Sequence, residues 1–337
     1  MIAITVDVGT TNSRIKVIEG RQILSISSAR VGIKDVAITG SQEILEKGLA
    51  EIIHEGLKKA NRRIEDVEYF AASGMITCNL GLMELPHRIC PVSMNDLVNG
   101  IEKKSFSWCD NKPFYFIPGV KNDVEVPSME SLDHIDVMRG EEVESFGIIE
   151  LCNIKGPALL ILPGSHTKFV WINEFNEIER CSTTMLGEFL HALVNATILS
   201  SSILPSLITE IDETSIKQGI AFELENGVTK SAFAVRLMDI QLETTSNERA
   251  NFLAGALISN DINPNIIADI KSKYHHIYIG GASPLKETFK IVLNSRGIDD
   301  ADITVLTDDI TDCAASTGAL MLVEKLRSTH SKELVQN

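Results

Sequence analysis

The clearest pattern along the chain is an apolar run, a short polar bend and a second apolar run, and it occurs twice. Near the N-terminus, residues 2–6 are apolar, "DVGTTN" follows, and a second apolar segment covers 14–19. The β-branched content of these segments predicts an antiparallel hairpin. Residues 157–178 repeat the outline, with apolar strands predicted at 159–162 and 169–172 around the bend "PGSHTK". The repeat indicates two halves of similar design.

The segments between and after these hairpins alternate strands with helices. Residues 41–60 carry apolar side chains at helical spacing, and Ser41 is the predicted N-cap. This mixture predicts the α/β class. Further strands are predicted at 67–76, at 113–120 and within 275–283, and further helices at 185–199, 231–242, 248–258 and the C-terminal end.

The domain organisation follows from where the pattern restarts. A second strand–bend–strand unit begins near residue 150, and no low-complexity linker precedes it. We therefore predict an N-terminal domain over 1–150 and a C-terminal domain over 151–337, packed together around a cleft. The last helix is a candidate to pack back on the N-terminal domain.

Composition narrows the class of protein. The 337 residues are 44% hydrophobic and 23% charged, which is typical of a globular protein that stays in water. No apolar run approaches the ~20 residues that span a bilayer, and we see no secretion signal, so we expect a cytoplasmic protein. The six cysteines form no CxxC pair and are expected to be reduced thiols.

The net charge limits the ligands. A formal charge of -15 argues against nucleic acid, whose phosphates would be repelled. An anionic small molecule can bind only where basic groups or backbone N–H dipoles locally reverse that field. The two bends are the first places to look for such a reversal.

The first bend combines an acid, a glycine and two threonines. Gly9 lets the backbone approach a ligand closely, and Thr10 and Thr11 add hydroxyl donors. Successive N–H groups in such a turn form an anion site, and Asp7 at the strand end can hold Mg²⁺. The alternative is a plain hairpin turn, because glycine, threonine and asparagine suit turns in any case.

The second bend has a similar set of donors, but its charged residue is a lysine where the first bend has an aspartate. "PGSHTK" offers backbone donors, two hydroxyls and Lys168. His166 is more often an ordinary loop histidine with a hydrogen bond. Two such bends facing each other across a cleft would clamp a nucleotide phosphate tail from both sides.

A later strand that ends at Gly280 and Gly281 exposes backbone against which a flat ring could lie. No Walker A motif and no GxGxxG occur, which disfavours a P-loop and a dinucleotide fold.

"DVMRGEEVES", residues 136–145, is the most unusual stretch. An acid here, either Glu141 or Glu142, could accept a hydroxyl proton during phosphoryl transfer. Arg139 could grip a carboxylate with two parallel hydrogen bonds. The bland alternative is helix capping, since acids in a first helical turn complement the macrodipole. Asn79 and Glu188 could meet a sugar, and capping explains Glu188 about as well.

Taken in order, "DVGTTNSR", "PGSHTK" and "GGAS" resemble the first phosphate, second phosphate and adenosine motifs of the sugar kinase, heat-shock ATPase and actin superfamily. More narrowly, "VMRGEE", "LPGSHTKFVWI" and "TTMLGEFLH" resemble the 2-dehydro-3-deoxygalactonokinase family. The resemblance covers nearly the whole chain. It implies an α/β fold of two ribonuclease-H-like domains that face each other across a nucleotide-binding cleft.

The resemblance also implies an activity and a set of residues. The activity is MgATP-dependent phosphorylation of the 6-hydroxyl of 2-dehydro-3-deoxy-D-galactonate, giving the 6-phosphate for aldol cleavage in galactonate catabolism. Asp7 would serve the metal, and Glu141 or Glu142 would be the base, where many relatives have aspartate. The implied phosphate- and ATP-binding residues are Gly9, Thr10, Thr11, Gly164, Ser165, His166, Thr167, Lys168, Gly280, Gly281 and Ala282. The candidate substrate-binding residues are Asn12, Arg14, Asn79, Arg139 and Glu188.

The expected partners are ATP and a small anionic sugar acid, with no nucleic acid and no membrane, and a homodimer is a possible assembly. Three alternatives stay open, because a fold does not define its function. They are a kinase for another small hydroxylated acid such as pantothenate, a phosphatase on this scaffold, and a non-catalytic nucleotide or sugar sensor.

Overall fold

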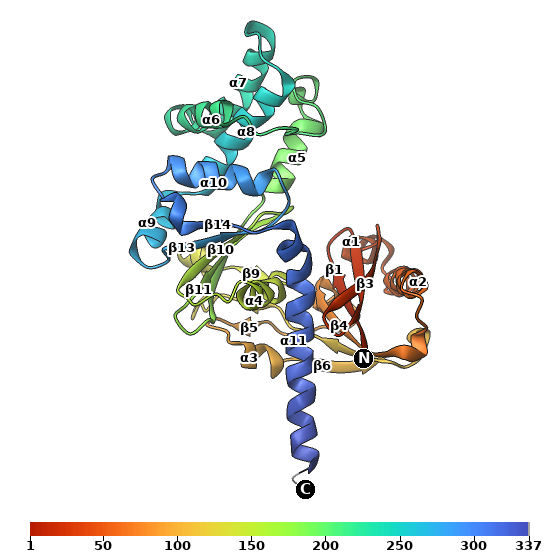
Figure 1. The fold of residues 1–337 in the computed structure, drawn as a ribbon. Coiled ribbons are helices and arrows are strands. Elements are labelled where there is room, and N and C mark those ends of the chain that lie inside the picture. The colour runs from red at the N-terminus through yellow and green to blue at the C-terminus, as the bar shows by residue number, and fades with distance from the viewer. Residues whose placement is uncertain (336–337) are drawn as a thin grey trace. The chain divides into compact units, whose positions relative to one another are not determined.

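The structure is a computed structural model that describes residues 1–335 (Figure 1). Its contacts divide the chain into two compact units. Unit one comprises Met1–Ile154, Asn176–Cys181 and the chain from Asp312 onward, and unit two comprises Lys155–Phe175 and Ser182–Thr311. Part of the last helix therefore groups with the N-terminal residues. The two domains proposed from the sequence, divided at residue 150, stay a prediction.

Unit one is built on a six-stranded sheet with the order β3-β2-β1-β4-β7-β6. The first hairpin is confirmed, because β1 and β2 pair antiparallel, and β4 and β7 continue the sheet in parallel. Strands β1 and β4 are buried along most of their length, as expected for central strands. The strands are β1 (Ile2–Val8), β2 (Ser13–Glu19), β3 (Gln22–Ala29), β4 (Val67–Gly74), β6 (Glu102–Ser105) and β7 (Pro113–Phe116).

Helix α2 (Glu43–Lys59) covers one face of this sheet with the apolar side chains that its spacing predicted. The N-cap is Gln42 and not Ser41, so the predicted cap is wrong by one residue. Ser41 Oγ still accepts the Glu43 N–H at 3.2 Å and satisfies one free donor of the first turn. The other helices of this unit are α1 (Ile33–Thr39), α3 (Met94–Val98), α4 (Glu141–Leu151) and most of α11 (Asp308–Val335).

A small three-stranded sheet also belongs to unit one. Its order is β5 (Arg88–Ile89), β8 (Val120–Lys121) and β9 (Val137–Met138), with β5 parallel and β9 antiparallel to β8. Val120 and Met138 are buried, whereas Ile89, Lys121 and Val137 on the alternate positions are exposed. One face of this sheet therefore lies on the protein and the other is open.

Unit two contains a five-stranded sheet with the order β12-β11-β10-β13-β14. The order matches that of β3-β2-β1-β4-β7 in unit one, strand for strand. In both sheets the first strand along the chain pairs antiparallel with the second, and the later strands continue the sheet in parallel. The second hairpin and the predicted repeat are confirmed, and so is the α/β class. The strands are β10 (Ala158–Leu162), β11 (Thr167–Ile172), β12 (Ile178–Thr184), β13 (His276–Ile279) and β14 (Ile303–Val305).

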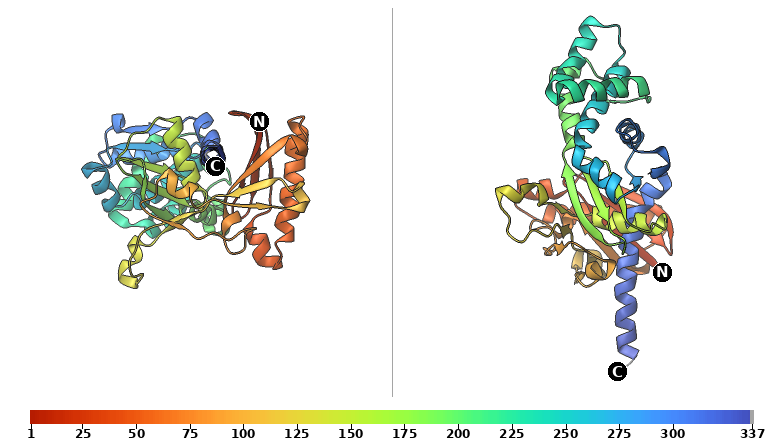
Figure 2. Two further views of the ribbon diagram at one scale, coloured as in Figure 1. Left: turned by 90° about the horizontal axis from the view of Figure 1, so that it is seen from below. Right: turned by 90° about the vertical axis from the view of Figure 1, so that its left-hand side faces the viewer.

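Helices dominate the rest of unit two, and α6, α7 and α8 extend away from its sheet (Figure 2). Helix α8 is buried almost all round, and α6 approaches it so closely that a Cβ on Gly219 would lie 2.0 Å from the Phe252 carbonyl oxygen. The helices predicted over 185–199, 231–242 and 248–258 exist with shifted ends. The helices are α5 (Leu186–Ala196), α6 (Glu213–Asn226), α7 (Val228–Gln241), α8 (Ser246–Asp261), α9 (Pro264–Ser272) and α10 (Leu285–Ser295).

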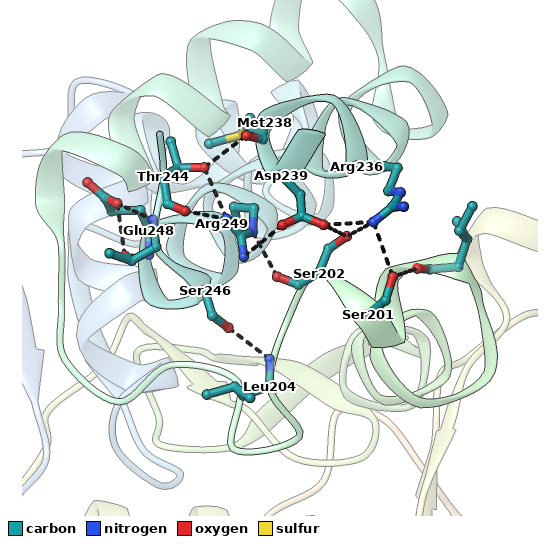
Figure 3. Close-up of polar contacts among 12 residues, drawn as sticks. Ser201, Ser202, Leu204, Arg236, Met238, Asp239, Thr244, Ser246, Glu248 and Arg249 are labelled. Atoms are coloured by element: carbon teal, nitrogen blue, oxygen red, sulfur yellow. Dashed lines mark hydrogen bonds and ion pairs between the residues drawn. The ribbon is translucent and has the colours of Figure 1, made fainter. Parts of the chain in front are cut away.

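Two arginines and an aspartate tie these helices to the loop before them (Figure 3). Asp239 on α7 pairs with Arg236 Nη1 at 2.7 Å and with the largely buried Arg249 Nη2 of α8 at 3.2 Å. Arg249 Nε donates to the Ser202 carbonyl oxygen at 2.7 Å. The buried charge of Arg249 is thus paired, as burial requires.

Among the described residues, no helix is both long and apolar enough to cross a membrane. All six cysteines are free thiols.

Candidate active site

The first bend is held from behind by the start of α1. The Gly9 N–H donates to the Asn12 carbonyl oxygen at 2.8 Å, and the Gly9 and Thr10 carbonyl oxygens accept the N–H groups of Ile33 and Lys34. The contact is close, because a Cβ on Gly32 would lie 2.5 Å from the Thr10 carbonyl oxygen. Two carbonyl oxygens of the bend are thereby engaged, while its threonines are exposed. The two threonine side chains of the bend are therefore open to solvent.

Asp7 lies where three segments of unit one meet. It is next to last in β1, opposite Ser73 of β4. A Cβ on Gly74 would lie 2.9 Å from Asp7 Oδ1, and one on Gly140 would lie 3.9 Å from the same atom. Gly74 adopts φ +81°, which favours glycine, so the strand end can pass this close to the carboxylate.

Asp7 keeps exposed surface as a residue, although many protein atoms lie around its carboxyl group. This partial removal from water, followed by the charge of Glu141, raises the pKa of Asp7 to about 6, and Arg14 and Lys16 oppose the shift. The charge of Glu141 therefore acts on Asp7, and a nearby cation would favour the ionised form of both acids.

The two adjacent glutamates of α4 have different surroundings. Glu142 is fully buried, and both of its carboxylate oxygens accept the Gly140 N–H, at 2.9 and 2.8 Å. Burial, followed by the charge of Glu141, raises the pKa of Glu142 well above its usual value. Glu141 is half-buried, and its Oε2 has no hydrogen-bond partner among the described residues. Helix capping therefore accounts for Glu142, whereas Glu141 keeps a carboxylate oxygen that could contact a ligand.

Helix α4 is held in place by α11. A Cβ on Gly147 would lie 1.9 Å from the Ala314 carbonyl oxygen, and one on Gly318 would lie 2.0 Å from the Val143 carbonyl oxygen. Only glycine permits backbones to approach so closely. The crossing fixes the start of α4, and with it Glu141, relative to the core of unit one.

Two charged residues near this acid pair were missed by the sequence reasoning. Half-buried Glu144 has its pKa raised to about 8 by burial, then by Glu141 and Asp7, while Lys16 lowers it. Lys16 is buried, and its Nζ donates to the Asp312 carbonyl oxygen. The three-residue spacing from Glu141 could have indicated Glu144, because residues i and i+3 share a helix face. Nothing local indicated Lys16.

Arg139 occupies a corner formed by the segment after β4. Its Nη1 donates to Thr77 Oγ1 at 2.8 Å, and its Nη2 donates to the Leu85 carbonyl oxygen at 2.7 Å. Nη2 also lies 3.4 Å from His87 Nδ1. Exposed Asn79 belongs to the same segment. Nε of Arg139 has no partner among the described residues, so part of the guanidinium remains available to a ligand.

The second bend is held in the same way by the start of α5. The Ser165 carbonyl oxygen accepts the Glu188 N–H at 2.9 Å, and a Cβ on Gly187 would lie 2.0 Å from the Gly164 carbonyl oxygen. Gly164 and Ser165 are exposed. His166 Nε2 lies 3.5 Å from Glu188 Oε1, which ties the tip of the bend to the helix.

Below this bend the side chains turn inward. Thr167 Oγ1 is buried without a hydrogen-bond partner among the described residues. Lys168 is buried and its Nζ donates to Thr183 Oγ1 at 2.7 Å. A short bond of 2.5 Å joins Thr184 Oγ1 to Asp261 Oδ2, and burial raises the pKa of Asp261 to about 6 while Thr184 lowers it. The sequence reasoning missed Asp261, which comes from the end of α8.

The glycine pair after β13 contacts the second bend directly. Gly281 adopts φ +79°, and a Cβ there would lie 2.7 Å from the Pro163 carbonyl oxygen. The adjacent Ala282 is exposed. The predicted second phosphate and adenosine segments are therefore neighbours within unit two.

The predicted residues thus form two groups, one in each unit, and their roles stay predictions. Unit one contains Asp7, Gly9, Thr10, Thr11, Asn12, Arg14, Asn79, Arg139, Glu141 and Glu142, and unit two contains Gly164, Ser165, His166, Thr167, Lys168, Glu188, Gly280, Gly281 and Ala282.

The protein side chains alone do not supply a full set of ligands for a metal ion. Among the described residues, no group of three or more His, Cys, Asp or Glu side chains is arranged to hold an ion. Mg²⁺ commonly uses one or two carboxylates and completes its shell with water and substrate phosphates. Asp7 fits that pattern as a single carboxylate at the end of β1, beside the first bend.

The repeated sheet order and the two bends define the class. Two solved structures that share the fold are the activator of the 2-hydroxyisocaproyl-CoA dehydratase from Clostridium difficile with bound ADPNP and component A of the (R)-2-hydroxyglutaryl-CoA dehydratase from Acidaminococcus fermentans. The first has a TM-score of 0.54 and 12% identity over 98% of both chains. The second has a TM-score of 0.52 and 14% identity over 97% of this chain and 99% of its own. The fold is that of the sugar kinases and actin-like ATPases.

The family is narrower than the fold. The family model described as 2-keto-3-deoxy-galactonokinase matches residues 7–314, and the chain belongs to that family of sugar kinases. A solved protein from Sinorhizobium meliloti, provisionally assigned as a 2-dehydro-3-deoxygalactonokinase, has a TM-score of 0.73 and 20% identity over 96% of both chains. No curated protein sequence gives a significant match. The resemblance that the motifs indicated is confirmed.

Proposed function

We propose that the protein is an ATP-dependent sugar-acid kinase that phosphorylates the 6-hydroxyl of 2-dehydro-3-deoxy-D-galactonate and forms the 6-phosphate for aldol cleavage. The observation that carries this proposal is that Asp7, at the strand end that leads into the Gly-Thr-Thr bend, lies beside Gly140 at the start of α4 and senses the charge of Glu141. Family membership supports the same chemistry. The sugar acid and the phosphorylated position belong to the proposal.

The two bends would bind the phosphates. Their glycines allow close backbone approach, and exposed Thr10, Thr11 and Ser165 add hydroxyl donors. Buried Thr167 Oγ1 needs a hydrogen-bond partner that a phosphate oxygen would provide. Backbone N–H groups suit this task in a protein with a net charge of -15, because they attract anions without adding titratable charge.

Glu141 is the residue that we propose as the general base. Its carboxylate would accept the 6-hydroxyl proton while that oxygen attacks the γ-phosphorus and the bond to the ADP oxygen breaks. Glu142 is the weaker candidate, since both of its oxygens engage the Gly140 N–H inside the protein. We propose that Glu142 orients the start of α4 and thereby positions Glu141.

Asp7 is the residue that would hold Mg²⁺, which leaves the Glu141 carboxylate free to act as the base. The ion would neutralise charge on the β- and γ-phosphates when it is bound. The residues of the protein would do the remaining work of orienting ATP and the hydroxyl and excluding water, which competes for the phosphoryl group.

The direct test is coupled detection of ADP release with a panel of 2-keto-3-deoxy sugar acids that differ in epimer and chain length. We expect turnover with 2-dehydro-3-deoxy-D-galactonate and weaker turnover with its epimers. Turnover with another small hydroxylated acid, and none with this panel, would reassign the substrate. ATP binding without turnover on any acid would favour the sensor alternative.

The remaining expectations from the sequence are also part of this proposal. We propose two ribonuclease-H-like domains that close on the nucleotide, a location in the cytoplasm, and a homodimer as the assembly to be tested.

A further inference from the structure

The exposed face of the small β5-β8-β9 sheet carries a row of basic side chains. His87, Gly119 and Arg139 directly adjoin the three strands, and the Arg88 N–H donates to the Gly119 carbonyl oxygen at 2.8 Å. A Cβ on Gly119 would lie 2.5 Å from Arg139 Cγ and 3.1 Å from His87 Cδ2. The absence of a side chain at Gly119 lets the arginine and the histidine meet across the middle strand.

Lys121 extends this row. Side chains alternate across a strand, so Lys121 points to the same face as residue 119, two positions before it. Its neighbours in the pairing register, Ile89 and Val137, are 53% and 48% exposed, which marks the face as open. The face therefore carries exposed Lys121 and half-buried His87 and Arg139 together with two exposed apolar residues.

The electrostatics of His87 show that the local field is positive. Burial, followed by the charges of Arg139 and Lys121, lowers the pKa of His87 to about 4. Both charged groups that act on the imidazole are cations, in a protein whose net charge is -15. Arg139 itself also senses the acids Glu142 and Glu84. An anion bound at His87 would be attracted by the positive charges of Arg139 and Lys121. It could also accept a hydrogen bond from the neutral imidazole.

We propose that His87, Lys121 and Arg139 form the subsite for the carboxylate of the sugar acid. This inference rests on the proposed function, since it names the group that would recognise the acid end of that substrate. Arg139 Nε has no partner among the described residues, so a donor remains although Thr77 and Leu85 occupy the other two nitrogens. His87 would donate from Nε2, because Nδ1 faces Arg139 Nη2.

The distance to the base agrees with this assignment. Arg139 precedes Glu141 by two residues, so their Cα atoms lie at most about 7 Å apart. A six-carbon acid has its carboxylate and its terminal hydroxyl at opposite ends of a chain of comparable length. The same short segment could therefore hold the acid end and activate the 6-hydroxyl. This arrangement would make the carboxylate a specificity determinant for the hydroxyl that reacts.

The kinetic test compares the sugar acid with its uncharged amide in wild-type protein and in Lys121→Gln and His87→Gln. We expect Lys121→Gln to raise KM for the acid about 10-fold, as for a lost charge-assisted hydrogen bond, with kcat and KM for ATP within about 2-fold. His87→Gln should raise the same KM about 5-fold. The preference for acid over amide should shrink by the same factors. Lys103→Gln is the matched control, because Lys103 is an exposed lysine of β6 in the same unit.

A binding measurement keeps the subsite testable without turnover. The His87 ring resonance, identified by its loss in His87→Gln, should not titrate between pH 5 and 8, since its pKa is about 4. Adding the sugar acid should shift this resonance and raise its pKa, and the amide should not. If wild-type protein phosphorylates the acid while both variants keep its KM, the subsite is wrong and the kinase stands. If no acid is turned over, a shifted His87 resonance still supports the subsite, and an unchanged resonance overturns it.

Discussion

The bends of the two hairpins, β1–β2 in unit one and β10–β11 in unit two, share one scaffold and differ in their chemistry. Each follows the first strand of a sheet with the same strand order. A Cβ on Gly9 would lie 3.3 Å from the Asn12 carbonyl oxygen, and one on Gly164 would lie 3.3 Å from that of His166. A glycine at a helix start holds each bend from behind, Gly32 in one and Gly187 in the other. The repeat thus extends to the backbone of the bends.

The charged surroundings of the bends differ, although both contain acids and bases: Arg14 and Lys16 act on Asp7 at the first, and His166 contacts Glu188 at the second. Acids adjoin the first, where the pKa values of Asp7 and Glu144 are raised in part by Glu141. Hydroxyls and a buried lysine adjoin the second, where Lys168 donates to Thr183. The same backbone therefore occurs with different charged neighbours in the two units. Flanking residues, and not the hairpin itself, give each bend its electrostatic character.

The largest expected effect is on kcat, and it distinguishes the adjacent glutamates of α4, Glu141 and Glu142. Glu141→Gln should lower kcat about 10²-fold or more, because it removes the proposed base. Glu142→Gln should have a smaller effect on kcat, because Glu142 is buried and its oxygens accept the Gly140 N–H, a bond that the glutamine oxygen can keep. Steady-state kinetics with thermal unfolding of both variants provide the measurement. Full turnover in both variants would place the base elsewhere.

A second comparison asks whether both bends depend on their supporting glycines. Gly187→Ala forces a Cβ to within 2.0 Å of the Gly164 carbonyl oxygen, and Gly32→Ala forces one to within 2.5 Å of the Thr10 carbonyl oxygen. Each should displace its bend, raise KM for ATP about 10-fold and cost about 1–3 kcal/mol of stability, as for overpacking.

Gly9→Ala is the milder control for these two variants, since its new Cβ would meet a carbonyl oxygen at 3.3 Å. Its KM for ATP should stay closer to the wild-type value. An unchanged KM in Gly187→Ala, together with a raised one in Gly32→Ala, would mean that only the first bend contacts ATP.

The smallest expected effects concern the pH dependence of stability. The folded state binds more protons than the unfolded state wherever an acid has a raised pKa, so the free energy of unfolding falls as pH rises through that window. For Glu144 the window runs from 4.5 to about 8, and for Asp261 from 3.8 to about 6. Glu144→Gln should therefore raise stability at pH 8 by about 1–3 kcal/mol and change it little at pH 4.

Asp261→Asn should raise stability at pH 8 by about 1–2 kcal/mol, and most of its gain should already be present at pH 6.5. Denaturant unfolding at several pH values distinguishes the two variants. A gain for Glu144→Gln that is complete by pH 5.5 would contradict the raised pKa of that residue.

Long buried strands could be predicted from the sequence, whereas very short strands and weakly patterned helices could not. Strands β1, β2, β10 and β11 were predicted because their apolar runs are long and buried. The two-residue strands β5, β8 and β9 are too short to show a period, so nothing local indicated the small sheet. Helix α6 was also missed, because it mixes charged with apolar residues and buries only a narrow stripe.

By itself the sequence determined the two hairpins, the positions of their glycines and the segments that carry acids and hydroxyls, because these depend on neighbours along the chain. Only the tertiary structure decided that Glu142 points inward while Glu141 stays available, and that Lys16, Glu144 and Asp261 join the sites. Burial, hydrogen bonding and electrostatic fields arise between residues distant in sequence. The same reason explains why three scattered basic residues, His87, Lys121 and Arg139, became visible as one surface only in the folded chain.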